Sequence, residues 1–203
     1  MKLILASGSP RRLQLLQQIG IYPQVVSSEA EEIQKDLPPE ALVQQNALMK
    51  ARSVAAKVGT DTMILAADTV VVLGRKILGK PGTPEKAAAM LRLLSGETHQ
   101  VLTGVTLLYR EKVLTRVEKT LVYMAPLTDT MIARYVRSGE PLDKAGAYAI
   151  QGAAAQFIPH IMGSYSNVVG LPLYTVTQMI AEMDGTTDDT IFDQRDAAGG
   201  TPS

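Results

Sequence analysis

The chain has 203 residues with no cysteine and two histidines, and its 20 basic side chains are balanced by 20 acidic ones. The lack of cysteine excludes disulfides and thiolate chemistry, and two histidines are too few for a structural zinc site without carboxylates. A balanced charge does not favour nucleic acid as a partner, and no run approaches the ~18 apolar residues of a membrane span. We therefore expect a cytoplasmic protein that binds neither nucleic acid nor membrane.

The apolar spacing predicts alternating strands and helices in the first half of the chain and a long hairpin in the second. This pattern indicates an α/β protein with a mixed, twisted β-sheet flanked by helices. We place one domain at residues 1–183 and expect the polar segment 184–203 to be largely disordered. In chain order, we expect a strand at 3–6, a helix at 10–19, a strand at 24–27, a helix at 39–58 and a strand at 62–73. A turn into 77–78 follows, then a helix at 84–95 and strands at 98–109 and 112–124. The last predicted elements are a helix at 128–138, a loop over 139–157, a strand at 157–162 and a helix at 172–183.

The turn Ser7–Arg12 follows the first strand and opens the first helix. Ser9 is a natural N-cap, which places Arg11 and Arg12 in the first turn, where a cation is unfavourable by about 0.3–1 kcal/mol. A bound phosphate would remove that conflict, since free N–H groups, two serine hydroxyls and two guanidinium groups all favour an anion. The alternative is a capped surface helix whose arginines face solvent or pair with the acids at 31–32.

Asp68 interrupts the strongest apolar strand of the sequence. A buried carboxylate is costly unless it is paired or bound to a metal. This position favours a catalytic or metal-binding acid, although an Asp satisfied by a neighbouring Arg, Lys or backbone amide would also fit. Thr69 follows it and either points to the opposite face of the strand or lies where the strand opens into a loop.

Several other polar residues have both a bland and a functional interpretation. Lys80 is followed by a proline that restricts its loop, which suits a phosphate contact, and Lys50 lies deep in the helix at 39–58. The acids at 31–32 indicate either a solvated face or a Mg²⁺ site. Gln151, in a loop rich in polar groups and glycine, could pair with an amide-like edge because it both donates and accepts, or it could be a surface turn residue.

Cations beside a helix start suit a polyphosphate, and carboxylates suit Mg²⁺ and the activation of a water. Six stretches in order resemble the Maf family of nucleoside triphosphate pyrophosphatases over residues 1–183: "ASGSPRR", "AADTVV", "LGKP", "SGETHQVLTGV", "EPLDKAGAYAIQG" and "SNVVGLPL". The resemblance implies an inosine triphosphatase-like fold with the active-site cleft between two lobes. It also implies hydrolysis of a nucleoside triphosphate to the monophosphate and pyrophosphate with a divalent cation, Mg²⁺ or Mn²⁺.

The resemblance also implies roles for individual residues. Asp68 matches the catalytic acid, as proton acceptor, metal ligand or both, and Glu32 matches a second metal position. The group that prefers dTTP and UTP is matched by Arg11, Thr69 and Gln151. The remaining implied positions are Arg12, Lys50 and Lys80 for catalysis and Ser9, with Ser7 of the same turn, for the substrate.

The biological role that the family implies is sanitation of the nucleotide pool, with a link to cell-division arrest and assembly as a homodimer. Two alternatives stay open on the sequence. One is a non-enzymatic nucleotide-binding regulator of septum formation. The other is the same chemistry on 7-methyl-GTP or another modified nucleotide, modified pyrimidine nucleotides included.

Overall fold

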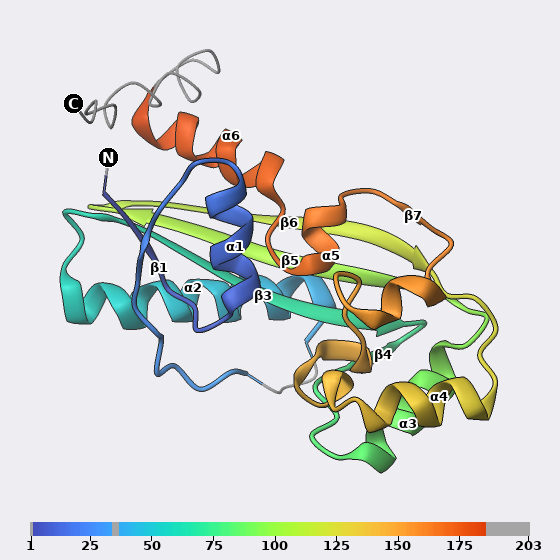
Figure 1. Ribbon diagram of the computed structural model, residues 1–203. Helices are drawn as coiled ribbons and strands as arrows, with labels where there is room; N and C mark the ends of the chain where they lie inside the picture. The colour runs from blue at the N-terminus through green and yellow to red at the C-terminus, as the bar shows by residue number, and fades with distance from the viewer. Residues whose placement is uncertain (1, 34–36, 186–203) are drawn as a thin grey trace, which may run out of the picture.

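The protein is described by a computed structural model that covers residues 2–33 and 37–185 (Figure 1). The C-terminal segment 184–203 was expected to be largely disordered. Its first residue, Asp184, ends a helix, and residues 186–203 lie outside the described ranges. No helix in the described ranges is long and apolar enough to cross a membrane.

Seven strands of the described residues form one mixed sheet in the order β2-β1-β3-β5-β6-β7, with β4 paired to β3. β1 runs parallel to β2 and β3, whereas β3, β5, β6 and β7 are antiparallel neighbours. The mixed sheet predicted from the sequence is therefore confirmed. The strands are β1 (Leu3–Leu5), β2 (Gln24–Val25), β3 (Met63–Leu73), β4 (Lys76–Leu78), β5 (Thr98–Tyr109), β6 (Lys112–Tyr123) and β7 (His160–Met162).

Helices cover both faces of the sheet (Figure 1). α2 lies on one face, α1, α5 and α6 lie on the other, and α3 and α4 pack together beyond one end. The α-helices are α1 (Pro10–Gln18), α2 (Pro39–Val58), α3 (Pro84–Leu94), α4 (Asp129–Arg137), α5 (Tyr165–Val169) and α6 (Leu173–Asp184).

Two large apolar clusters divide the molecule into two lobes. The first lobe packs α1 and α6 on β1, β3 and β5, and α2 closes its other face. The second lobe packs α3, α4 and the segment 140–157 around the start of β5 and the end of β6. The sheet continues through both lobes, so the two cores are held in a fixed relation by the same strands.

The alternation of β3 decides which layer each of its side chains meets. Successive residues point to opposite faces, and the even-numbered positions Ile64, Ala66, Val70 and Val72 pack with residues of α2. Asp68 falls on this α2-facing row, whereas Thr69 falls on the opposite face. The strand thus presents a carboxylate to α2 and a hydroxyl to the side of α1.

The backbone of α2 approaches the sheet closely at Gly104 of β5, the direct partner of Asp68. A Cβ atom at Gly104 would lie 2.5 Å from the carbonyl carbon of Val43 and 2.9 Å from the amide nitrogen of Gln44. The missing side chain therefore lets the α2 backbone rest on the strand beside the carboxylate.

The structure differs from the sequence expectation mainly after α4. The segment expected to be mostly loop contains three short 3-10 helices, η1 (Glu140–Asp143), η2 (Ala145–Ala147) and η3 (Ala153–Phe157). α5 was not predicted, because a five-residue helix is too short to show a period. Its start is set by the hydroxyl of Ser164, which accepts from the N–H of Asn167. The strands expected at 24–27 and 157–162 are limited to the shorter β2 and β7.

Candidate active site

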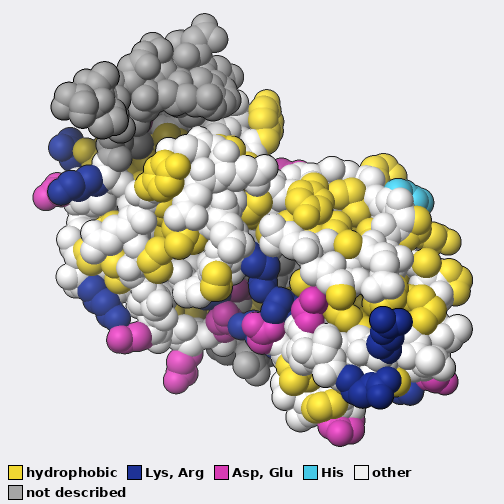
Figure 2. All heavy atoms as spheres, viewed as in Figure 1, with side chains coloured by type: hydrophobic (Ala, Val, Ile, Leu, Met, Phe, Trp, Pro, Cys, Tyr) yellow, Lys and Arg dark blue, Asp and Glu magenta, His cyan; other side chains and the backbone are white. Residues whose placement is uncertain are grey.

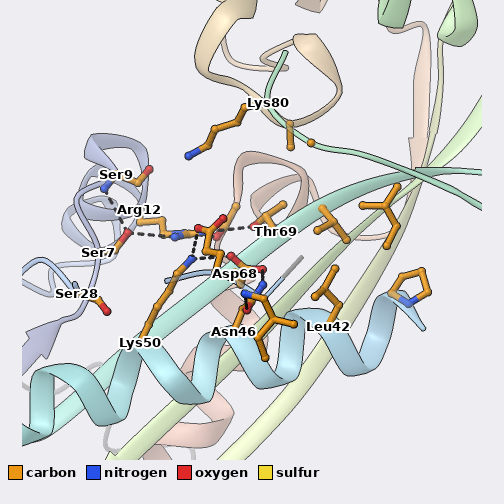
Figure 3. Close-up of a pocket in the computed structure, with 18 of the residues that line it drawn as sticks. Ser7, Ser9, Arg12, Ser28, Leu42, Asn46, Lys50, Asp68, Thr69 and Lys80 are labelled. Carbon is orange, nitrogen blue, oxygen red and sulfur yellow. Dashed lines mark hydrogen bonds and ion pairs between the residues drawn. The ribbon is translucent and has the colours of Figure 1, made fainter. Parts of the chain in front are cut away.

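A cleft of about 1320 Å³ opens between the two lobes. Basic and acidic side chains gather near the middle of the face shown in Figure 2. In the close-up of Figure 3, Arg12 and the serines approach from the α1 side, Lys50 and Asn46 from α2, and Lys80 from the opposite side. The cleft is lined by nine of the residues predicted from the sequence: Ser7, Ser9, Arg11, Arg12, Glu32, Lys50, Asp68, Thr69 and Lys80.

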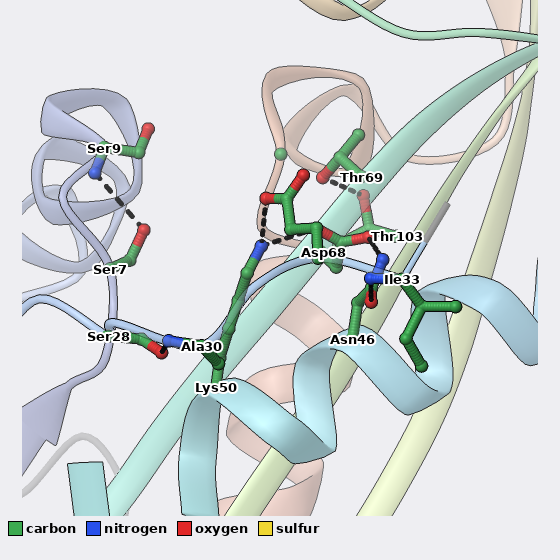
Figure 4. Close-up of polar contacts among 12 residues, drawn as sticks. Ser7, Ser9, Ser28, Ala30, Ile33, Asn46, Lys50, Asp68, Thr69 and Thr103 are labelled. Carbon is green, nitrogen blue, oxygen red and sulfur yellow. Dashed lines mark hydrogen bonds and ion pairs between the residues drawn. The ribbon is translucent and has the colours of Figure 1, made fainter. Parts of the chain in front are cut away.

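Asp68 lies at the floor of the cleft and is buried, with 6% of its surface exposed. The Nζ of Lys50 donates to its Oδ1 at 2.6 Å, and the Nδ2 of Asn46 donates to its Oδ2 at 3.1 Å (Figure 4). Asn46 and Lys50 lie one turn apart on α2, so a single helix face supplies both partners. Each carboxylate oxygen therefore has a fixed donor, which sets the orientation of the acid.

Asn46 was missed by the sequence analysis. Its side chain is buried, and its Oδ1 accepts from the N–H of Ile33 at 2.8 Å while its amide nitrogen holds Asp68. One residue thus links the segment that carries Glu32 to the acid on β3. The pattern that could have found it is a four-residue spacing on α2, in which a polar Asn falls in line with the buried Leu42.

Glu32 makes the second ion pair of Lys50, with 2.7 Å between the Nζ and its Oε1. Burial tends to raise the pKa of Glu32, but the hydrogen bond and charge of Lys50, together with Lys80 and Arg12, outweigh it and lower the pKa. The carboxylate is half exposed, so it faces the cleft rather than the core. Lys50 therefore joins two acids that lie far apart in sequence.

Arg12 is held by three neutral acceptors. Its Nε donates to the carbonyl of Gly170 at 2.8 Å, and its two terminal nitrogens donate to Ser7 Oγ and Thr69 Oγ1, both at 3.1 Å. Burial lowers the pKa of Arg12, and the negative charge of Asp68 opposes that shift. A guanidinium stays protonated in proteins, so this side chain brings a fixed positive charge that is contacted directly by no carboxylate of the described residues. The interpretation of Arg12 as a partner of the acids at 31–32 is not what the structure shows.

The start of α1 has the expected boundary but lacks the expected cap. Ser9 is the N-cap residue and Pro10 begins the helix, yet the Ser9 hydroxyl makes no capping hydrogen bond, and the first turn contains no acid. The N–H of Ser9 itself donates to Ser7 Oγ at 3.2 Å. Among residues 2–33 and 37–185, the Ser9 hydroxyl and the first N–H groups of α1 thus have no hydrogen-bond partner, and this helix start lines the cleft.

Arg11 and Lys80 line the cleft without a hydrogen bond or an ion pair to any described residue. Gln151, equally unpaired within the described ranges, lies outside the main cleft. It lines a small adjoining recess, which it shares with Arg11 and Tyr148. The structure thus brings Gln151 close to Arg11, whereas Thr69 lies in the main cleft, where its hydroxyl contacts Arg12 and Thr103.

The sequence as a whole matches that of known proteins. Residues 2–183 match the family described as Maf-like protein. The chain belongs to the Maf family. Relatives of this Maf protein include a dTTP/UTP pyrophosphatase of Halalkalibacterium halodurans, 53% identical over 84% of this chain and 90% of the relative. Another is a dTTP/UTP pyrophosphatase of Symbiobacterium thermophilum, 49% identical over 89% of this chain and 93% of the relative.

The fold of this Maf protein also resembles a solved structure of much lower sequence identity. A HAM1 protein from Coxiella burnetii superposes with a TM-score of 0.51 at 16% identity, over 90% of this chain and 99% of that one. The likeness concerns the fold, a mixed sheet flanked by helices, which agrees with the inosine triphosphatase-like fold expected from the resemblance.

The residues of this Maf site fit a divalent cation bound together with a ligand. Within the described residues, no group of three or more His, Asp or Glu side chains is placed to hold a metal ion alone. Glu32 and Asp68 nevertheless converge on one point, the Nζ of Lys50. Two carboxylates plus phosphate oxygens are a donor set that Mg²⁺ commonly uses. The protein supplies part of such a set, and a polyphosphate would supply the rest.

Proposed function

We propose that this Maf protein hydrolyses dTTP and UTP to the monophosphate and pyrophosphate. The observation that carries the proposal is the position of one oriented, buried acid, Asp68, at the floor of a cleft whose walls hold Arg11 and Lys80, two cations with no ion pair to a described residue. The names of relatives about half identical to the chain support the same activity.

The triphosphate would lie between the start of α1 and Lys80. Ser9 and the N–H groups of the first turn favour an anion, and Arg12 adds a charge that its own partners orient but do not neutralise. Lys80 reaches into the cleft from the second lobe, on the other side of the same space. Charge that develops on the departing pyrophosphate would be stabilised by these groups.

Asp68 would act as the proton acceptor for the attacking water. In-line attack at the α-phosphorus transfers the water oxygen to the monophosphate and leaves pyrophosphate. Lys50 and Asn46 hold the two oxygens of Asp68 and so keep the carboxylate in one orientation. Glu32 and Asp68 would hold Mg²⁺ or Mn²⁺, which when bound would neutralise part of the triphosphate charge.

The base would be recognised at the recess next to the cleft. The Gln151 amide can donate and accept at once, which matches the imide edge of thymine or uracil. Arg11 is shared by the cleft and the recess, so it is placed where the phosphate and base parts of a nucleotide would meet. A site built to hydrogen-bond one base edge rejects a base with the other donor and acceptor order.

The test is to incubate the purified protein with dTTP, UTP, CTP or 7-methyl-GTP and Mg²⁺ or Mn²⁺, and to measure monophosphate and pyrophosphate. We expect turnover of dTTP and UTP, with oxygen from labelled water appearing in the monophosphate. Asp68→Asn should lower the turnover by about 10²–10⁴-fold, whereas Asp61→Asn, at a fully exposed acid, should leave it unchanged.

Three outcomes would change the assignment. Tight nucleotide binding with no turnover under either metal would favour the non-enzymatic regulator. Preferred turnover of 7-methyl-GTP would move the chain to the other substrate group. Label in the pyrophosphate would contradict attack at the α-phosphorus.

A further inference from the structure

Gln151 lies at the recess proposed for the base, on a segment of short turns, and its side chain makes no hydrogen bond to any described residue. The geometry of such a residue has to be set by its backbone. Base recognition by Gln151 therefore depends on the contacts that hold the main-chain groups on either side of it.

Two side chains of the second lobe hold this backbone. The phenol oxygen of Tyr135, on α4, accepts from the N–H of Ala149 at 3.2 Å. One carboxylate oxygen of Glu140, at the start of η1, accepts from the N–H of Ala153 at 3.1 Å. These amides lie two residues before and two residues after Gln151.

Tyr135 and Glu140 are also joined to each other. The Tyr135 hydroxyl donates to Glu140 Oε1 at 2.7 Å, so each oxygen of the carboxylate has one partner. Three hydrogen bonds therefore link the Ala149 N–H, the Tyr135 phenol, the Glu140 carboxylate and the Ala153 N–H in series. This series joins the two ends of the turn that carries Gln151. Burial, and then the hydrogen bond to Glu140, raise the pKa of Tyr135, so the hydroxyl remains protonated and can donate.

The turn rests directly on the carboxylate at Gly152. A Cβ atom at this residue would lie 2.5 Å from Glu140 Cδ, so a side chain there would displace the acid. On the other side of the turn, the Tyr148 hydroxyl contacts Nε2 of buried His99 at 2.7 Å. The residues around Gln151 are thus held on both sides, while Gln151 remains free to meet a ligand.

We propose that Tyr135 and Glu140 are positioning residues that hold the turn around Gln151 and thereby set the base preference of the enzyme. The inference rests on the proposed function. Neither residue lines the cleft or the recess, so both act through Gln151. Glu140 forms no ion pair within the described ranges, and its charge is satisfied by the phenol and the amide alone.

The experiment is a double-mutant cycle between Tyr135→Phe and Gln151→Ala. Tyr135→Phe removes the hydroxyl and keeps the ring, which packs edge-on against Phe157. The measured quantity is the ratio of kcat/KM for dTTP to that for CTP, with kcat and KM reported separately. We expect Tyr135→Phe to lower this ratio about 5- to 10-fold through KM, because the turn loses the hydroxyl that joins the Ala149 amide to Glu140.

In the Gln151→Ala background, Tyr135→Phe should change the ratio no further, since the phenol acts only through that residue. Glu140→Gln should reproduce the loss in weaker form, because an amide can still accept from one partner. Tyr174→Phe, at a highly exposed tyrosine, serves as the matched control and should have no effect.

Each result has a distinct meaning. A selectivity unchanged in Tyr135→Phe, or an effect that persists in the Gln151→Ala background, would overturn the positioning role even if the midpoint of urea unfolding fell. Calorimetric binding of dTTP and CTP, measured in parallel, separates this failure from that of the proposed function. A wild-type protein that hydrolyses neither nucleotide but binds dTTP in preference, with the preference lost in Tyr135→Phe, would contradict the enzyme and retain the positioning role. Equal binding without turnover would overturn both.

Discussion

Replacing Gly104 by alanine should disturb the acid on β3 without touching it. The new Cβ would lie 2.5 Å from the carbonyl carbon of Val43, whereas real Cβ atoms essentially never come within 3.0 Å of another atom in this way. The obstacle is backbone and cannot rotate away, so α2 has to retreat from β5 by at least about 0.5 Å, the difference between these distances. Overpacking of this kind costs about 1–3 kcal/mol of unfolding free energy.

Lys50 lies on the same helix as Val43, roughly two turns further along. A retreat of α2 should therefore also move Lys50 away from Asp68. Their ion pair is 2.6 Å long, and a displacement of this size should lower kcat by about tenfold, since misplacement by 1 Å can cost about 100-fold. Urea unfolding and pyrophosphate release from dTTP measure the two effects. Gly79→Ala is the control for stability, since its Cβ would meet no atom within 4 Å. If Gly104→Ala kept both the unfolding midpoint and kcat of the wild type, the close packing of α2 would not be what orients the acid.

Four further changes test the charges and the one buried histidine. Arg12→Gln should lower kcat/KM about 10- to 100-fold for every nucleotide, because it removes charged hydrogen bonds, whereas Arg11→Gln should mainly alter the ratio between nucleotides; equal behaviour in a substrate panel would argue against this division. Lys50→Met should lower the unfolding free energy by about 3 kcal/mol by leaving buried Asp68 without its cation, and adding Asp68→Asn should restore part of it in urea titrations. Burial lowers the pKa of His99 to about 4, below its unfolded value of about 6.5. The unfolded chain therefore binds more protons than the folded one between these pH values. The free energy of unfolding should fall by up to about 3 kcal/mol as the pH drops through that window. His99→Asn should flatten that slope in pH-dependent unfolding, and a slope unchanged by the substitution would assign the pH dependence to other groups.

The sequence carried most of the information about the sheet and its acid. Asp68 could be singled out because it breaks an apolar strand, and period-two alternation places Thr69 on the other face. The structure shows both. Lys50 stayed ambiguous because no pattern within a helix states which strand residue lies opposite it. Asn46 was overlooked because a single Asn in a helix says nothing until its buried neighbours are known.

The second lobe was less predictable for a physical reason. The 3-10 turns from Glu140 to Phe157 are held by side chains such as Tyr135, which comes from another element. Local propensity contains no record of such tertiary hydrogen bonds. The sequence therefore indicated that this polar loop lines a site, but it could not indicate that Gln151 and Thr69 lie in different hollows.

The separation of these two hollows has a consequence for how the protein can change. Asp68 is built into the middle of a long strand that pairs with β5 on one side, so almost any alteration there is paid in stability. The turn around Gln151 is held by a few side-chain hydrogen bonds. Replacing one of the side chains that form them leaves the sheet intact. With the roles proposed above for Asp68 and Gln151, substitutions in the turn can therefore change the base preference while the strand that carries the acid stays unaltered.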